Sequence, residues 1–339
     1  MSELKTNKIS TNDQNNVAID NALGLKSYDT AGRDALTSVA GDMIYNTTTN
    51  KPQFYNGSAW ADFGPAVATI SYLVIAGAGG GGTSYGGGGG AGGYRNSYAS
   101  ETSGANSSTE TPITIFADGT STYVVTVGGG GSVETSGNDS VFSSITSIGG
   151  GAGETIANGV DGGSGGGGSG TNTGGSGTSN QGLAGAGGQD AGGGTASGGG
   201  GGGAGAAGTA APSTTVGGAG GNGLSSSIDT SATTRAGGGG GGAGNSGTGG
   251  AGGTGGGGAG GGNSSTGTAG TTNTGSGGGG GSRFGAGAAG GSGIVILRWA
   301  TADATIGATR TGLTDGGVQT DGSDSYIVFT AGTGTISFS

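Results

Sequence analysis

The sequence contains no cysteine and no histidine, and it is poor in proline, aromatic residues and charge. Without cysteine, the chain can form neither disulfides nor a Cys-rich zinc site. Without histidine, it lacks the commonest general base and metal ligand. Four prolines in 339 residues exclude collagen, which is proline-rich. We therefore expect no enzymatic activity, no cofactor and no bound metal.

Positive charge and long apolar runs are also scarce. The formal net charge is -10 and the isoelectric point is about 4.2, whereas nucleic acids and anionic membranes attract basic surfaces. The best apolar stretches, residues 72–76 and 294–297, are far shorter than the ~20 residues of a membrane-spanning helix. The first residues include no apolar signal-peptide core. We expect no nucleic-acid partner, no membrane insertion, no secretory signal and assembly in the cytoplasm.

What the sequence has in excess is glycine, at 98 positions, and its distribution is uneven. Residues 1–66 hold 5 of these glycines but 12 of the 30 charged residues. Between 149 and 293, 67 of 145 residues are glycine. These shifts predict three regions: 1–66, 67–299 and 300–339.

The first region reads as a small β module. Short β-prone runs between residues 42 and 63 predict a three-stranded meander, with a type I′ hairpin turn at Asn56-Gly57. So few strands bury little apolar surface. We therefore expect residues 1–66 to self-associate, with a small monomeric cap on the next domain as the alternative.

The glycine-rich block is either a flexible linker or an ordered lattice. Ordering 67 glycines costs on the order of 100 kcal/mol of backbone entropy, and glycine has no side chain to bury in return. However, its interruptions are mainly Ala, Ser, Thr and Asn, and apolar strands at residues 72–76 and 294–299 bracket it. A domain closed by pairing its first and last strands needs such brackets, so we predict order.

Glycine also recurs at every third position over long stretches, such as 275–293 with Phe284 as the exception. This spacing suits polyglycine-II helices, which have three residues per turn and no internal hydrogen bonds. We predict a bundle of them, with a silk-like β-stack as the alternative. Residues 326–330 and 335–338, separated by glycines, predict a C-terminal β-hairpin. The expected fold is mainly β, with a polyglycine-II bundle and little α-helix.

Known motifs carry no function here. Residues 77–82 match the G-x-G-x-x-G fingerprint, but the glycines that follow cannot form the helix that binds pyrophosphate. No lysine follows Lys51, which excludes a P-loop. Residues 137–142 resemble one turn of a calcium-binding repeat that needs stacked copies, and the aspartates near residue 320 lack the EF-hand order.

The polar patches between glycine runs predict loops, where recognition usually lies. Candidate contact residues are the aromatic and arginine side chains in or near these patches, because both types are common binding anchors. A purely structural alternative is that Tyr94 and Phe284 plug the ends of the bundle. The candidates are Tyr94, Arg95, Tyr98, Arg235, Arg283 and Phe284.

Several segments resemble fibre proteins of marine bacteriophages. The β-prone residues 41–63, with MIYN at 43–46 and YNGSAW at 55–60, resemble short modules of cyanophage tail fibres. YLVIAGAGGGG at 72–82, GAGGYR at 90–95, YVVTVG at 123–128 and GIVILRW at 293–299 are similar to a glycine-rich domain of such fibres. More distantly, the chain looks like the polyglycine-II tip adhesins of T-even-type phages.

This resemblance implies a receptor-binding tail fibre in the virion. Residues 1–66 would attach to the tail or baseplate and form a homotrimer, and loops would contact a glycan or outer-membrane protein of the host. One alternative is a structural virion protein, such as a head fibre or decoration protein. Another is an ice-binding or cell-surface protein, for which only Asn245, Thr248, Ala251 and Thr254, spaced three apart, offer a regular array.

Overall fold

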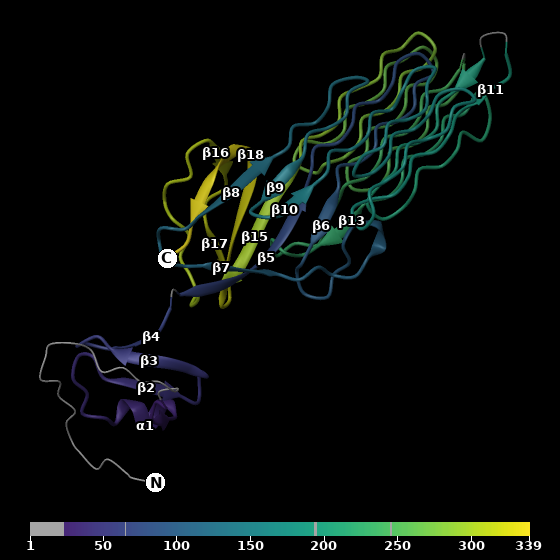
Figure 1. The fold of residues 1–339 in the computed structure, drawn as a ribbon. Helices are drawn as coiled ribbons and strands as arrows, with labels where there is room; N and C mark the ends of the chain where they lie inside the picture. The colour runs from purple at the N-terminus through teal and green to yellow at the C-terminus, as the bar shows by residue number, and fades with distance from the viewer. Residues whose placement is uncertain (1–23, 65, 193–194, 245) are drawn as a thin grey trace, which may run out of the picture. The chain divides into compact units, whose positions relative to one another are not determined.

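The computed structural model describes residues 24–64, 66–192, 195–244 and 246–339. The chain divides between Ala66 and Val67 into two compact units (Figure 1). This division coincides with the boundary expected near residue 66. Residues 300–339 belong to the second unit, so the boundary expected near 300 does not separate compact units.

The first unit contains the expected meander. Strands β2 (Met43–Asn46), β3 (Lys51–Tyr55) and β4 (Trp60–Asp62) pair antiparallel in sequence order. Strand β1 (Ser27–Tyr28) adds parallel to β2, and the short helix α1 (Thr30–Asp34) follows it. The type I′ prediction was wrong, because only Gly57 has a positive φ and the carboxamide of Asn56 instead accepts the N–H groups of Ser58 and Ala59.

The second unit is built around a nearly closed ten-stranded sheet. Seven strands follow the order β10-β9-β8-β18-β15-β5-β6; β7 also pairs with β5, and β16 and β17 also pair with β18. The strands are β5 (Val67–Ile75), β6 (Tyr94–Asn96), β7 (Ile113–Phe116), β8 (Thr122–Val127), β9 (Ser140–Phe142), β10 (Ile145–Ser147), β15 (Ile294–Ala300), β16 (Leu313–Asp315), β17 (Gln319–Asp321) and β18 (Asp324–Ser337).

The bracketing strands β5 and β15 pair with each other, as the sequence predicts, with Leu297 opposite Tyr72. Both faces of this pair are buried, which explains its almost continuous apolar sequence. One face, with Tyr72 and Leu297, packs on aromatic residues such as Phe329 inside the sheet. The other face, with Leu73 and Ile296, packs on side chains at the end of the glycine-rich region.

The predicted C-terminal hairpin was wrong in its position. Residues 324–337 form one long strand, β18, which pairs first with β15 and then with β8. Gly332 lies within this strand at a point where an added Cβ would overlap the carbonyl oxygen of Gly312. Glycine here permits close backbone approach instead of a reversal. The hairpin turn lies earlier, between β17 and β18, at Gly322 and Ser323.

Most of the glycine-rich region is neither helix nor strand, yet it is ordered by backbone hydrogen bonds. Residues 86–93 show the pattern. The N–H groups of Gly86, Gly89 and Gly92 donate to segment 275–281, those of Gly87, Gly90 and Gly93 to segment 148–154, and those of Gly88 and Ala91 to segment 199–202. The carbonyl groups accept from segments 76–82, 164–167 and 239–242. The neighbour therefore repeats every three residues, and three accepting plus three donating segments surround one chain.

This pattern identifies polyglycine-II helices, because a three-residue turn aims every third amide at the same neighbour. The close packing explains the composition. A Cβ at Gly88 would overlap the carbonyl group of Gly239, and one at Gly239 would overlap that of Gly278. The silk-like β-stack is thus not what the chain forms. We call this region the lattice.

Side chains appear where lattice segments face outward. Thr248, Ala251 and Thr254 are exposed on one edge, where their carbonyl groups accept from Gly217, Gly220 and Gly223. Asn245 of the same series lies outside the described residues.

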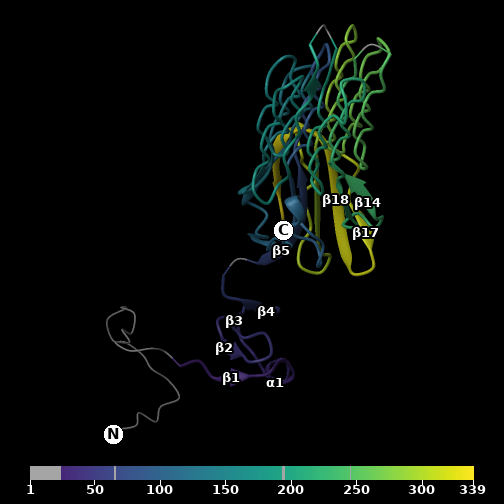
Figure 2. The same cartoon turned by 90° about the vertical axis from the view of Figure 1, so that its right-hand side faces the viewer.

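Lattice segments run up and down between two ends. At the end next to the sheet lie the loop with the 3-10 helix η1 (Gly104–Asn106), the turn at residues 178–181, and the hairpin of β13 (Leu224–Ser226) and β14 (Thr233–Arg235) (Figure 1). We call this the sheet end. The opposite end, the far end, carries the hairpin of β11 (Gln189–Asp190) and β12 (Ala196–Ser197) and the loops around residues 84, 156 and 283 (Figures 1 and 2).

Candidate functional site

The candidate contact residues lie at both ends of the lattice, not in one site. Four of them lie at the sheet end: Tyr94 and Arg95 on β6, Tyr98 after it, and Arg235 on β14. The other two, Arg283 and Phe284, lie at the far end. The burial and partners of each side chain decide which of them can reach a ligand.

Two of the candidates are buried. Tyr94 is 0% exposed in the apolar cluster at the sheet end, as the plug alternative predicts for this residue. Arg235 is 6% exposed and forms an ion pair with Asp229 at 2.6 Å. Burial and the nearby Glu101 raise the pKa of Tyr94, which keeps its phenol neutral. The expectation that these two side chains contact a macromolecule is therefore corrected.

Tyr98 is partly buried and acts as a support. The guanidinium group of Arg298 lies over its ring, 5.3 Å from the centroid. Arg298 is itself held by Asp321 at 2.7 Å and Asp324 at 2.9 Å, and it donates to the carbonyl group of Ile228. Tyr98 thus links the loop after β6 to strand β15 through a cation–π contact.

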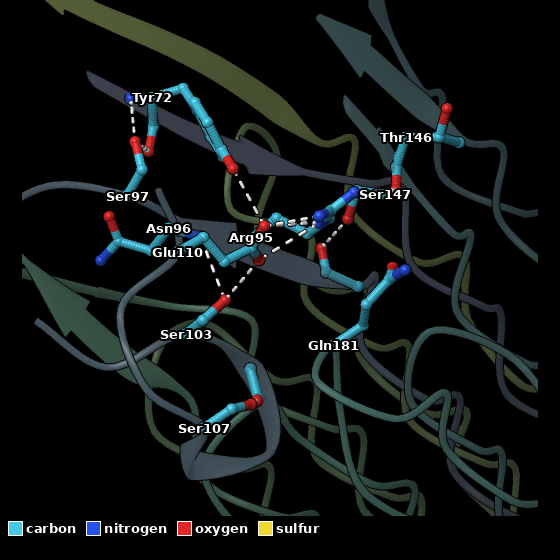
Figure 3. Close-up of polar contacts among 12 residues, drawn as sticks. Tyr72, Arg95, Asn96, Ser97, Ser103, Ser107, Glu110, Thr146, Ser147 and Gln181 are labelled. Atoms are coloured by element: carbon cyan, nitrogen blue, oxygen red, sulfur yellow. Dashed lines mark hydrogen bonds and ion pairs between the residues drawn. The ribbon is translucent and has the colours of Figure 1, made fainter. Parts of the chain in front are cut away.

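Arg95 forms the centre of a polar cluster at the sheet end (Figure 3). Its guanidinium group binds the carboxylate of Glu110 through Nε at 3.0 and 3.1 Å and through Nη2 at 2.5 Å. Nη1 donates to the carbonyl group of Thr146 at 3.3 Å. Although burial alone would lower the pKa of Arg95, the pairing with Glu110 outweighs it and raises that pKa.

Glu110 is held by further donors besides Arg95 (Figure 3). The hydroxyl groups of Tyr72 and Ser103 donate to it at 2.9 and 2.8 Å. Burial and the charge of Glu110 raise the pKa of Tyr72, so this phenol remains a donor. Ser103 in turn accepts the N–H group of Asn96 at 3.1 Å. The carboxylate of Glu110 is therefore held by side chains from β6, from the loop that follows it and from β5.

A pocket of about 490 Å³ lies beside this cluster. That volume is within the range of small-molecule sites, roughly 300–1,000 Å³. Its walls come from two loops that are far apart in the sequence, and its lining is polar. The lining residues are Arg95, Ser107, Ser108, Thr109, Glu110, Ser179, Asn180 and Gln181.

The second wall of the pocket is fixed by the lattice. The carbonyl group of Gln181 accepts the N–H group of Tyr94 at 2.9 Å, and its side-chain Oε1 accepts that of Ile148 at 2.8 Å. A Cβ at Gly93 would overlap this side chain. A missing side chain in the lattice therefore makes room for Gln181.

The far end presents a different surface. The guanidinium group of Arg283 lies over the ring of Phe284 at 4.9 Å, and Phe284 is 72% exposed. Exposure of Phe284 rules out its predicted role as a plug. Among the described residues, Arg283 forms no ion pair with a carboxylate, unlike Arg95, Arg235, Arg298 and Arg310.

Neighbouring far-end loops are tied together by Glu134. Its carboxylate accepts from the backbone and hydroxyl of Thr83 and from the hydroxyl of Thr155. Beyond Thr155, Ile156 is 81% exposed with φ 56°. A β-branched residue rarely adopts this conformation, so the loop holds an exposed apolar side chain against local preference.

Sequence reasoning missed Glu110, Gln181 and Ile156. Glu110 and Gln181 lie in two of the polar patches, residues 96–112 and 171–181, which the sequence predicts as loops, but nothing in the sequence pairs Glu110 with Arg95. The signal was the scarcity of charge, because the few arginines of a low-charge region need carboxylate partners when they are half-buried. For Ile156 the signal was an isolated large aliphatic residue between glycine runs.

In the described ranges, no group of three or more acidic residues is placed to hold a metal ion. None of the helices in the described part of the chain is long and apolar enough to cross a membrane.

A family model of the glycine-rich domain matches residues 53–300. Searches of curated proteins and of solved structures gave no significant match. The matched range includes the lattice, both bracketing strands and the Arg95 pocket, and it covers more than half of the chain. The chain therefore belongs to the glycine-rich domain family.

Proposed function

We propose that this protein is a bacteriophage tail-fibre component, without enzymatic activity, whose far-end loops bind the surface of a host cell. The observation that carries the proposal is the exposure of Phe284 and Ile156, at 72% and 81%, on loops anchored in a hydrogen-bonded lattice. Exposed apolar side chains beside an arginine are typical of binding surfaces.

The lattice supports this role through its rigidity. A loop whose two ends are fixed by backbone bonds loses little conformational entropy on binding. The resemblance to marine phage fibres supports the assignment to a virion, with residues 1–66 attaching to the tail or baseplate and forming a trimer. The alternative is a head fibre or decoration protein, which would share the lattice without binding a cell.

The test uses fluorescently labelled full-length protein on a panel of cyanobacterial and other marine bacterial strains. We expect binding to at least one strain, and at least a tenfold loss in the double variant Arg283→Ala/Phe284→Ala. Phe116→Ala is the matched control, because Phe116 is 49% exposed on β7. Unchanged binding of the double variant would remove the receptor role from the far end.

Location separates the two virion roles. Gold-labelled antibody against the protein should mark the tail of negatively stained virions. Label on the capsid would favour a head fibre or decoration protein, and virions without label would argue against a virion protein altogether.

A further inference from the structure

The Arg95 pocket has features of a binding site that the far-end surface does not share. It is formed by residues 107–110 and 179–181, with the guanidinium group of Arg95 beside them. Arg95 is 26% exposed and Glu110 is 16% exposed as side chains. The ion pair therefore lies in the wall of the pocket and remains partly accessible from it.

The charge of this wall is balanced. Arg95 binds Glu110 through two of its nitrogens, so the cation and the anion compensate each other. No other charged side chain lines the pocket. An anionic ligand such as a phosphate would need surplus positive charge, which Glu110 removes. The ligand class that fits is uncharged.

The wall offers hydrogen-bond donors. A guanidinium group has five N–H donors, and Arg95 uses Nε, Nη1 and Nη2 for one partner group each. One N–H on Nη1 and one on Nη2 remain. The carboxylate of Glu110 already accepts from Arg95, Tyr72 and Ser103. The ion pair in the wall therefore mainly offers hydrogen-bond donors to a ligand.

The rest of the lining can both donate and accept. Within the part of the chain that the structure describes, the side chains of Ser108, Ser179 and Asn180 have no hydrogen-bond partner, and neither does Nε2 of Gln181. Hydroxyl and carboxamide groups offer both functions. The lining contains no aliphatic or aromatic side chain of Leu, Ile, Val, Phe, Tyr or Trp, so an apolar ligand would gain nothing there.

We propose that this pocket binds a neutral sugar residue. A sugar is an uncharged ring with several hydroxyl groups at fixed spacing, and each hydroxyl can donate and accept. It therefore matches a compact, charge-balanced, polar pocket better than an ion or an apolar molecule does. This inference does not depend on the role proposed for the far end, because different residues carry each.

The experiment is saturation-transfer NMR of the full-length protein with glucose, galactose, mannose and N-acetylglucosamine. Glucuronic acid, N-acetylneuraminic acid and inorganic phosphate serve as anionic comparators. We expect at least one neutral sugar to bind at millimolar concentration and to shift the side-chain amide signals of Asn180 and Gln181. No signal from any neutral sugar, or stronger binding of the anionic probes, would overturn the proposal.

Variants locate the site. Ser108→Ala/Ser179→Ala should weaken sugar binding at least tenfold while leaving the melting temperature unchanged. The matched control is Ser225→Ala/Ser231→Ala, two exposed serines of the β13–β14 hairpin at the same end. Equal loss in both double variants would contradict the assignment to the pocket. The far-end variant Arg283→Ala/Phe284→Ala should bind the sugar normally, which separates this proposal from the proposed function.

Discussion

At the residue scale, glycine has two different roles in this protein. Inside the lattice, the missing Cβ allows one backbone to touch another, as at Gly88 against Gly239. Elsewhere, glycines such as Gly316 have no atom within 4 Å of the position a Cβ would take. The same substitution should therefore have opposite effects at the two kinds of site.

Gly88→Ala should destabilise the protein by at least about 1–3 kcal/mol, because the added methyl group meets a backbone carbonyl that cannot move aside. Gly316→Ala should be neutral or stabilise by up to about 1 kcal/mol, since it only restricts the unfolded chain. Chemical denaturation of both variants measures the difference. A Gly88→Ala variant as stable as the parent would contradict the close packing of the lattice.

The carboxylates at the far end predict a pH dependence. Hydrogen bonds from Thr155 and from the backbone of Thr83 hold the pKa of Glu134 below its usual range. Its stabilising contribution is present above the unfolded-state pKa, about 4.3, and is lost as pH falls through the folded pKa. Burial, and then the charge of Glu134, raise the pKa of Glu154. Its contribution has the opposite sign, favouring the folded state at low pH and disappearing as pH rises.

Thr155→Val should therefore raise the pKa of Glu134, and Glu134→Gln should lower the pKa of Glu154. Carboxyl carbon signals followed by NMR between pH 3 and 7 measure both shifts. Thr171→Val, at an exposed threonine of another far-end loop, is the control and should change neither pKa. If Glu154 titrates identically with and without Glu134, the two carboxylates are not coupled.

At the element scale, the sequence predicted the lattice and the strands that close it. The three-residue glycine spacing and the apolar runs on either side are local signals, and the structure confirms both the polyglycine-II helices and the pairing of β5 with β15. Strand β18 was misread, because a glycine that permits close approach looks like a turn glycine. Only the contact of Gly332 with Gly312 distinguishes the two kinds of glycine, and Gly312 is 20 residues away in sequence.

The ion pairs of the candidate site were unpredictable for a related reason. Arg95 meets Glu110, which lies 15 positions further along the chain, and the second wall of the pocket comes from residues 179–181. Which lattice segments pack side by side determines whether these pocket residues come together. Since glycine segments are nearly alike in sequence, nothing local specifies which one lies beside which.

A substitution in the core of the sheet tests the position of strand β18. Phe329 is 0% exposed in the apolar cluster within the sheet. Phe329→Ala should cost about 3–5 kcal/mol. Phe284→Ala removes the same atoms from the exposed far end and should change stability by less than about 0.5 kcal/mol. Thermal unfolding of the two variants makes the comparison, and similar melting temperatures would argue against the position of β18.

At the scale of the whole molecule, the two units differ in how they are stabilised. The second unit has two apolar clusters and an extensive network of backbone hydrogen bonds. The first unit has one small sheet, and its residues Val39, Met43 and Phe63 are 66%, 46% and 48% exposed. Apolar side chains exposed on so small a unit favour self-association.

Since the resemblance to phage fibres implies a trimer, we expect the full-length protein to have a mass about three times the 30.7 kDa of one chain. Light scattering after size exclusion measures this mass. Met43→Asp/Phe63→Asp should shift it toward the monomer, whereas Val318→Asp, at a residue 41% exposed in the second unit, should not. A monomeric parent protein would contradict association through residues 1–66.

The up-and-down course of the lattice has a consequence for how such proteins diversify. Loop 83–85 joins two segments that are already bonded to each other, since the N–H group of Gly82 donates to the carbonyl group of Gly87. A loop of another length or sequence would leave this bond in place and would lose only the loop's own bonds, such as the one from the N–H group of Ser84 to the carbonyl group of Gly285. A loop closed in this way can diverge in length and sequence while the lattice beneath it is preserved.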